Sequence, residues 1–164
     1  MIPVCHVDSG YMPKHAETRI LPYTSEQMYN LVGDVESYPG FLPWCSAARI
    51  RSSKIVDGRT EMRADLVISF KVFRERFGSS VLLDPEAHYI RTEYLDGPFK
   101  YMLSEWRFSD VEGGGCRIEF KTDFEFKSRI LEKVIGVVFH EAMQRVVRAF
   151  EDRAKTLYGT PTSA

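Results

Sequence analysis

The chain has 164 residues, of which 44% are hydrophobic and 27% are charged, and its formal net charge is −1. This length and composition predict one soluble globular domain with a single core and no second domain. The near-neutral charge argues against a broad electrostatic interaction with nucleic acid, so DNA is not an expected partner. The three cysteines are odd in number and widely spaced, which favours free thiols over a disulfide framework.

The ends of the chain carry few structural signals. Residues 1–14 are expected to be loosely ordered and residues 160–164 to form a C-terminal tail. The N-terminus lacks a basic segment followed by a long apolar one, so it is not typical of a secretory signal. The longest uncharged apolar stretch near the C-terminus, residues 134–139, is far shorter than the ~20 residues needed to cross a bilayer. A cytoplasmic location is predicted, with peripheral contact at the inner face of the plasma membrane as an alternative.

The first elements are a strand and two short helices. Residues 15–21 alternate like a strand, which Pro22 ends because proline cannot donate to a strand ladder. Thr24 and Gln27 have the spacing of a capping box and predict the start of a helix. A second helical turn is expected at residues 35–38. The apolar side of the first helix is formed by Met28, Leu31 and Val32.

The segment YPGFLPWC, residues 38–45, is the most unusual loop of the chain. It holds two prolines, a glycine and three aromatic residues. Connecting loops usually lie in water and carry polar residues, so this one is expected to fold against an apolar surface. Two interpretations remain open: the loop fills the domain's own core, or it forms part of the mouth of a cavity for an apolar ligand.

Six further strands are predicted between this loop and the C-terminal region. Short turns separate them, including the hairpin signal Asp57-Gly58, a tight turn at residues 84–86 and a glycine-rich reversal at residues 112–115. Such closely linked strands predict an antiparallel sheet that is solvated on one face. The expected strands are residues 47–56, 59–71, 72–83, 88–94, 100–110 and 116–127.

Alternation along these strands assigns side chains to the two faces of the sheet. In the last strand the inner positions are Cys116, Ile118, Phe120, Thr122, Phe124 and Phe126. In the second of the six they are Met62, Ala64, Leu66, Ile68 and Phe70. By the same count, solvent is expected at Glu61, Asp65, Glu105 and Arg107.

One long helix is predicted to follow Ser128, a plausible N-cap, and to end at Tyr158 before Gly159. Its middle part is apolar nearly all round, which is more than one contact with a sheet requires. One interpretation places it between the sheet and the loop at residues 38–45. The other is that one side packs on the sheet while another lines a cavity, touches a membrane surface or meets a partner.

Four segments carry a resemblance to a known family. They are MYNLVGDVESYPGFLPWCSAARI, residues 28–50; RERFGSSVLLDP, residues 74–85; YLDGPFKYMLSEWRF, residues 94–108; and DFEFKSRILEKVIGVVFHEAM, residues 123–143. These are similar to the coenzyme-Q-binding START-domain proteins of bacteria and mitochondria. That group includes ribosome-association toxins of the RatA type and lies beside the polyketide cyclase/dehydrase group in the SRPBCC superfamily. The resemblance covers about residues 14–159.

The resemblance implies an α+β helix-grip fold, like that of START and Bet v 1 domains, in a single ligand-binding domain at residues 15–159. A strongly curved antiparallel sheet of about seven strands would wrap around the long C-terminal helix and leave an elongated apolar cavity. Trp44 and Trp106 are the best candidates for its rim, because a large ring with an N–H suits the edge of a pocket. The full set of candidate ligand-binding residues is Trp44, Leu66, Ile68, Phe70, Tyr94, Met102, Trp106, Phe108, Phe124, Val138, Ala142 and Met143.

The ligand implied by the resemblance is ubiquinone, bound without covalent attachment. Burying one isoprene unit contributes roughly 3 to 4 kcal/mol, at about 0.8 kcal/mol per methylene-sized group. Two or three buried units therefore offset an association cost of about 4 to 15 kcal/mol. The quinone oxygens would accept hydrogen bonds from Tyr94, Ser104 or Trp106.

Neither a catalytic residue nor a metal site is expected. The sequence contains no glycine-rich phosphate loop, no paired-cysteine motif and no nucleophile elbow. The four histidines are scattered, and only His140 has an acidic neighbour, Glu141, on a helix where adjacent residues point apart. A cyclase-like enzyme is the minor alternative, and a buried carboxylate at Glu61, Asp65 or Glu105 would favour it.

Ribosome binding is the main alternative to a quinone carrier, and it requires a contiguous basic surface. The cations available for it are Arg145, Arg148, Arg153 and Lys155 on the last helix, together with Arg49 and Arg51. The same side chains also suit a plainly solvated helix face, or contact with anionic lipid headgroups while an apolar side enters the membrane. The sequence leaves these three interpretations open.

Overall fold

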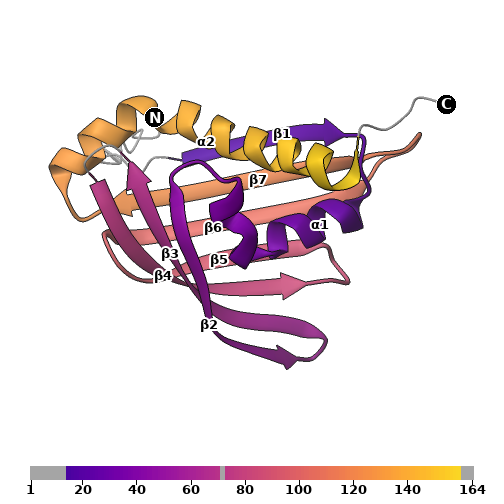
Figure 1. Cartoon of the computed structure of the whole chain (residues 1–164), viewed down its shortest axis with the longest axis horizontal. Helices are drawn as coiled ribbons and strands as arrows, with labels where there is room; N and C mark the ends of the chain where they lie inside the picture. The colour runs from indigo at the N-terminus through magenta and orange to yellow at the C-terminus, as the bar shows by residue number, and fades with distance from the viewer. Residues whose placement is uncertain (1–13, 71–72, 160–164) are drawn as a thin grey trace, which may run out of the picture.

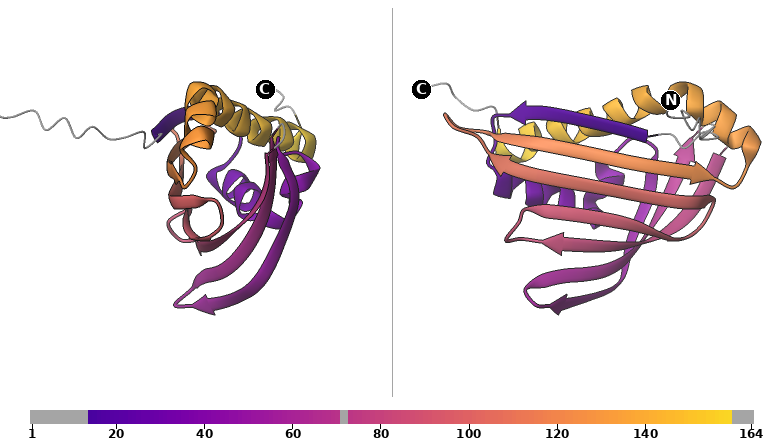
Figure 2. Two further views of the ribbon diagram at one scale, coloured as in Figure 1. Left: turned by 90° about the vertical axis from the view of Figure 1, so that its left-hand side faces the viewer. Right: turned by 180° about the vertical axis from the view of Figure 1, so that it is seen from behind.

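The computed structural model describes residues 14–70 and 73–159. Within them, seven strands form one antiparallel sheet in the order β1-β7-β6-β5-β4-β3-β2. The sheet is strongly curved, and the long helix α2 lies along its concave side (Figures 1 and 2). This is the predicted α+β arrangement, with two short helices after the first strand.

The strands agree with the sequence prediction to within two residues at each described end, because their alternation and their turns are both distinct. Their bounds are β1 Lys14–Leu21, β2 Cys45–Val56, β3 Arg59–Phe70, β4 Phe73–Asp84, β5 Tyr89–Asp96, β6 Phe99–Asp110 and β7 Cys116–Phe126. Lys14 was expected to be loosely ordered, but it pairs with Asp123 as the first residue of β1. Residues 1–13 and 160–164, also expected to be loose ends, lie outside the described residues.

The helices are α1 (Ser25–Gly33), the 3-10 helix η1 (Val35–Gly40) and α2 (Arg129–Tyr158). The predicted capping box of α1 is confirmed. The backbone N–H of Gln27 donates to Thr24 Oγ1 at 3.0 Å, and the backbone N–H of Thr24 donates to Gln27 Oε1 at 2.9 Å. Helix α1 lies beside the C-terminal half of α2, so it covers only one end of the concave face (Figure 1).

The hydrophobic core consists of two clusters of buried residues. The larger one joins α1, the middle strands and the C-terminal half of α2, and it includes Met28, Trp106 and Phe150. The smaller one, formed by Phe77, Phe99, Met102 and Phe126, lies under the other half of the concave face. The inner positions of β7 are buried as its alternation predicted, except for the half-buried Phe124.

Strand β2 ends the sheet on one side, opposite β1. Its pairing with β3 shifts register between Cys45 and Ala47 and again between Ile50 and Ser52, which marks two irregularities of the β-bulge kind. The β2–β3 hairpin turns at Asp57 and Gly58, both with positive φ, as in a type I′ turn. This hairpin projects away from the helices (Figure 2).

Candidate functional site

An apolar cavity of about 160 Å³ lies between the smaller core cluster, helix α2 and the loop that precedes β2. Among its described lining residues, the only side-chain hydrogen-bonding group is the indole N–H of Trp44, and none is an acid or a base. Such a cavity suits the hydrocarbon part of a ligand. The lining residues are Leu42, Pro43, Trp44, Ile68, Phe70, Phe77, Phe99, Phe124, Phe126, Ile135, Val138, Phe139, Ala142, Met143 and Val146.

Seven of the twelve candidate residues lie in this lining. The inner positions of β3 and β7, the loop and the facing side of α2 each contribute some of them. They are Trp44, Ile68, Phe70, Phe124, Val138, Ala142 and Met143. That these residues contact a ligand stays a prediction.

Trp106 and Phe108 lie elsewhere, which corrects their expected place at the cavity. Trp106 is 6% exposed and belongs to the larger cluster. Its ring stacks on Phe120 with centroids 4.2 Å apart and meets the edge of Phe150 at 5.2 Å. Both residues do point inward, as alternation predicted, but α1 and α2 fill that half of the concave face. The indole of Trp106 is therefore part of the solid core and does not form a rim.

The other three candidates lie next to the cavity but outside its lining. Met102 is buried in the smaller cluster, and Leu66 packs against both clusters. Tyr94 packs on Phe99 with ring centroids 5.6 Å apart, and its buried hydroxyl has no hydrogen-bond partner among the described residues. These three side chains therefore pack in the core beside the cavity lining.

Eight lining residues were not singled out from the sequence as ligand-binding candidates. Two precede β2, three come from β4, β6 and β7, and three lie on α2. They are Leu42, Pro43, Phe77, Phe99, Phe126, Ile135, Phe139 and Val146. Alternation already placed Phe126 on the inner face, and the three residues on α2 belong to the helix whose middle part was predicted to be apolar nearly all round.

The turn between β5 and β6 positions Phe99 in the cavity wall. Gly97 has a φ of 135°, and a Cβ there would lie 2.7 Å from the Cβ of Phe77. Only glycine lets the turn pass this close to β4. The ring of Phe99 then packs on Phe77 and Phe126, with centroid separations of 5.4 and 5.0 Å.

The loop at residues 38–45 does both things that its composition suggested. Tyr38 and Phe41 fill the larger core, each with its ring centroid 5.4 Å from that of Phe150. Burial raises the pKa of the Tyr38 hydroxyl, which donates to the carbonyl of Val32. The following residues, 42–44, instead line the cavity. The loop therefore closes one half of the concave face and borders the opening of the other.

Trp44, Phe70, Val138 and Ala142 form the boundary of the cavity with an outer hollow, and we call these four residues the mouth. These four residues also line a shallower hollow outside, together with Glu141 and Arg145. The rings of Trp44 and Phe70 meet edge to face at 5.5 Å. Trp44 has a φ of 64°, in a region that costs a non-glycine residue about 1 kcal/mol or more. The Trp44 backbone therefore adopts an unfavourable conformation that places the indole at the mouth.

The proposed hydrogen-bond donors for a quinone do not line the cavity. Trp106 is in the larger core, and Tyr94 packs against the smaller cluster. The hydroxyl of Ser104 pairs with that of Thr122 at 2.9 Å. None of these three groups lines the cavity, so their contact with a ligand stays a prediction, and the indole N–H of Trp44 is the donor in the lining.

Asp65 differs from the expectation that it is solvent-exposed, since it is only 9% exposed. It does point away from the cavity, as alternation predicted, but Arg51 and Arg76 cover it with charge-assisted hydrogen bonds. Glu105 accepts a hydrogen bond from Tyr89 at 2.7 Å. Neither carboxylate is among the lining residues, so the burial of Asp65 does not place an acid in the cavity.

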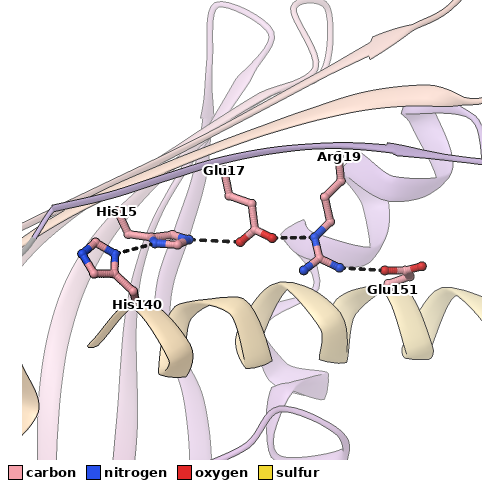
Figure 3. Close-up of polar contacts among 5 residues, drawn as sticks. All are labelled: His15, Glu17, Arg19, His140 and Glu151. Carbon is pink, nitrogen blue, oxygen red and sulfur yellow. Dashed lines mark hydrogen bonds and ion pairs between the residues drawn. The ribbon is translucent and has the colours of Figure 1, made fainter. Parts of the chain in front are cut away.

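A row of five polar side chains joins β1 to α2 (Figure 3). Nδ1 of His140 lies 3.1 Å from Nδ1 of His15, whose Nε2 lies 3.0 Å from a carboxylate oxygen of Glu17. Arg19 then bridges Glu17 and Glu151, reaching the latter at 3.0 Å. The contact between the two histidines needs one ring as donor and the other as acceptor. Sequence reasoning treated the histidines as scattered, because the packing of α2 on β1 has no local signal.

The cations considered for a basic surface have different environments. Arg51 pairs with Asp65 and Arg145 with Glu141, the latter at 3.0 Å. The guanidinium of Arg153 lies 5.3 Å from the ring centroid of Phe41. No ion pair is found within the described part of the chain for the three exposed cations Arg49, Arg148 and Lys155.

The described residues contain neither a metal site nor a membrane-spanning helix. No group of three or more histidine, cysteine or acidic side chains there is placed to hold a metal ion. No helix in the described ranges is long and apolar enough to cross a bilayer. Cys45 and Cys116 are buried free thiols, while Cys5 lies outside the described residues.

A curved sheet gripping a long helix around an apolar cavity defines the helix-grip class of START and Bet v 1-like domains. The family "Polyketide cyclase / dehydrase and lipid transport" matches residues 21–151. The chain therefore belongs to this family.

Two groups of curated relatives are similar to the chain over most of its length. The ribosome association toxin RatA of Escherichia coli K12 is 39% identical over 147 residues, which is 90% of each protein. The coenzyme Q-binding protein COQ10 homolog B, mitochondrial, of Xenopus laevis is 34% identical over 150 residues, covering 89% of this chain and 59% of that protein.

Solved structures agree with the fold. An 18 kDa protein from Caulobacter crescentus superimposes with a TM-score of 0.76 at 36% identity, over 91% of this chain and all of that one. A START superfamily protein from Mycobacterium smegmatis (TM-score 0.73, 20% identity, 88% of this chain and 98% of that one) shares the fold. A Streptomyces aromatase/cyclase also shares the fold, with a TM-score of 0.74 at 16% identity over 88% of this chain and 94% of that one.

Proposed function

We propose that this protein binds a hydrophobic ligand without chemical conversion, and that the ligand is ubiquinone, carried in support of respiratory electron transport. The apolar cavity is the observation that carries the proposal. Its fifteen lining residues include no acid or base that could act on a substrate. The similarity to a relative named for coenzyme Q binding supports the choice of a quinone.

The cavity must widen to accept this cargo. Its volume is about 160 Å³, whereas pockets for drug-sized ligands typically measure about 300 to 1,000 Å³. The cavity widens at the mouth in this proposal, because the side chains there from the loop, β3 and α2 are all apolar. An isoprenoid tail makes apolar contacts in place of those that the separated side chains lose. Its burial contributes about 0.8 kcal/mol to binding per methylene-sized group.

The row of five polar side chains attaches α2 to β1 on the side of the helix opposite the mouth. His140 and Glu151 hold the helix to β1 through His15 and Arg19. Movement at the mouth can therefore leave the attachment to β1 in place. In this proposal α2 and residues 42–44 separate to admit the tail, and the Trp44 indole N–H donates to a quinone oxygen.

The first experiment is to purify the whole chain without detergent from a ubiquinone-producing host and to identify the extracted lipid by mass spectrometry. Stoichiometric ubiquinone is expected. An Ala142→Phe variant places a ring in the mouth and should retain at least about tenfold less quinone, because it occupies the volume that the tail needs. Its matched control is Gln144→Phe, which puts the same ring on an exposed position of the same helix.

Two results would contradict this proposal. One is an empty wild-type protein that also takes up no short-chain ubiquinone on titration. The other is equal quinone content in the Ala142→Phe and Gln144→Phe variants, with both folded by circular dichroism, which would place the ligand outside the cavity.

Ribosome association is the second candidate function, and the 39% identical relative named for it favours it. The exposed cations Arg49, Arg148 and Lys155 are available for contacts with RNA phosphates. Cosedimentation with ribosomal subunits should then weaken steeply as salt is raised. An Arg148→Glu variant should bind less than a Lys121→Glu variant, which changes an exposed cation on β7. Absent or salt-insensitive cosedimentation would remove this candidate.

A further inference from the structure

The first turns of α2 expose three large apolar side chains. Ile130 is 78% exposed, Val134 is 49% exposed and Val137 is 87% exposed. Their spacing of four and three residues places them on one face of the helix. We call these three residues the α2 patch. A helix face in water usually carries polar side chains instead, so this face is expected to bind an apolar partner or surface.

The α2 patch adjoins the mouth of the cavity. Val138 follows Val137 directly and is four residues from Val134, and it belongs to the mouth itself. These turns of α2 stand at the same end of the molecule as the C-terminal end of β3 and the N-terminal end of β4 (Figure 1). The apolar surface therefore runs from the cavity lining through Val138 onto the outside of the helix.

Exposed cations lie before and between the residues of the α2 patch. Lys127, Arg129 and Lys133 are all exposed, and Glu132 is the single acid between residues 127 and 137. Three cations and one anion give this segment a charge of +2, although the whole chain carries −1. Cations beside an exposed apolar helix face are the features of a helix that lies on an anionic membrane surface.

We propose that the first turns of α2 dock on an anionic lipid bilayer, with the α2 patch inserted between the headgroups and the mouth facing the membrane. This deepens the proposed function and rests on it, since a carrier of a membrane quinone has to open towards the bilayer. Lys127, Arg129 and Lys133 contact lipid phosphates, while Val137 and Ile130 enter the acyl boundary.

Two other occupants fit the surface less well. A second copy of the chain would bring the same cations together, and three side chains are far too few for the ~1,200 Å² that a specific interface usually buries. RNA would use the cations but offers the three apolar side chains no apolar phase. A lipid surface uses both the charge and the apolar face.

The test is flotation of the whole chain with vesicles that contain no quinone, made of phosphatidylcholine with phosphatidylglycerol or of phosphatidylcholine alone. Binding is expected only to the anionic vesicles and should weaken with added salt. The double variant Ile130→Ser with Val137→Ser should lower the partition coefficient about tenfold, because it removes two inserted side chains. The variant Arg129→Glu with Lys133→Glu should lower it by at least as much.

Each variant has a matched control. Ile55→Ser removes an apolar side chain that is also 78% exposed, on the distant β2–β3 hairpin. Arg117→Glu with Lys121→Glu reverses two exposed cations on β7. Both controls should bind vesicles within about twofold of the wild type, since a change below ~0.4 kcal/mol is less than a factor of two.

The outcomes separate docking from the proposed function. Vesicle binding without any quinone uptake would leave docking in place and remove the carrier role, and quinone uptake without vesicle binding would do the reverse. Docking is overturned if the patch variants float like their controls. It is equally overturned if sedimentation equilibrium shows a dimer that the patch variants convert to monomer, because the occupant would then be a second copy.

Discussion

The two halves of the concave face are built from the same sheet and the same helix, yet one is solid and the other is hollow. In the solid half, α1 and Tyr38 fill the space between the strands and the C-terminal half of α2, around Trp106. In the hollow half, no helix among residues 14–70 and 73–159 takes the place of α1, and α2 faces the sheet across the cavity. The contrast shows that a helix-grip domain can divide its apolar surface between a packed core and a cavity.

Aromatic truncation should affect the two halves very differently. Trp106→Ala is expected to destabilise the protein by about 3 to 5 kcal/mol, because it leaves a large void in the solid half. Trp44→Ala at the mouth should cost about 1 kcal/mol or less, since that indole is half-buried. Urea unfolding followed by circular dichroism measures both. Similar losses would mean that the mouth is as tightly packed as the core.

Adding volume sharpens the same comparison with one substitution at two positions of α2. Ala154 is 0% exposed in the solid half, so Ala154→Leu should destabilise by about 1 to 3 kcal/mol through overpacking. Ala142 lines the cavity, so Ala142→Leu should be neutral or stabilise by up to about 1 kcal/mol. Thermal unfolding of the two variants decides the point, and a loss at Ala142 equal to that at Ala154 would argue against an open cavity.

The polar row of Figure 3 spans both halves, and it should contribute less than either core. His140→Ala leaves the Nδ1 of His15 without this partner in a side chain that is 7% exposed, at a cost of about 1 to 2 kcal/mol. The neighbouring Glu141→Ala removes only an exposed pair with Arg145 and should cost about 0 to 0.5 kcal/mol. Equal effects on the melting temperature would show that the row does not hold α2.

The smallest expected effect is the pH dependence of the solid half. Burial raises the pKa of Cys116 from 9.0 to about 11. The unfolded chain therefore loses this proton first, and stability falls as the pH rises above 9. The free energy of unfolding should fall by about 0.8 kcal/mol between pH 8 and pH 9.5. Cys116→Ala should flatten the dependence of unfolding free energy on pH, and an unchanged slope would assign it to another group.

Most of the fold was predictable because its signals are local. The alternation in β7, the Asp57-Gly58 turn and the Thr24 capping box each depend on residues close in sequence. Gly159, with a φ of 79°, ends α2 as expected. The resemblance to the family then supplied the curvature and the grip, which no local pattern contains.

For the candidate site, the sequence predicted only the face of the sheet or helix on which each side chain lies. Alternation correctly turned Trp106 and Phe108 inward, but it does not tell which half of the face α1 fills. Asp65 was placed on the correct side of the sheet, yet its burial depends on Arg51 and Arg76 from neighbouring strands. Contacts across the fold, such as that between His15 and His140, have no counterpart in the spacing of residues along the chain.

The edge strand β2 has a consequence for solubility at high concentration. An open strand of twelve residues offers backbone groups with which another molecule could extend the sheet. Its two bulge-like irregularities interrupt a flat edge, and Arg49, which is exposed and has no ion pair among the described residues, would add a like charge if two copies paired side by side. The protein can therefore keep a long strand at the end of its sheet without that edge serving as a template for fibres.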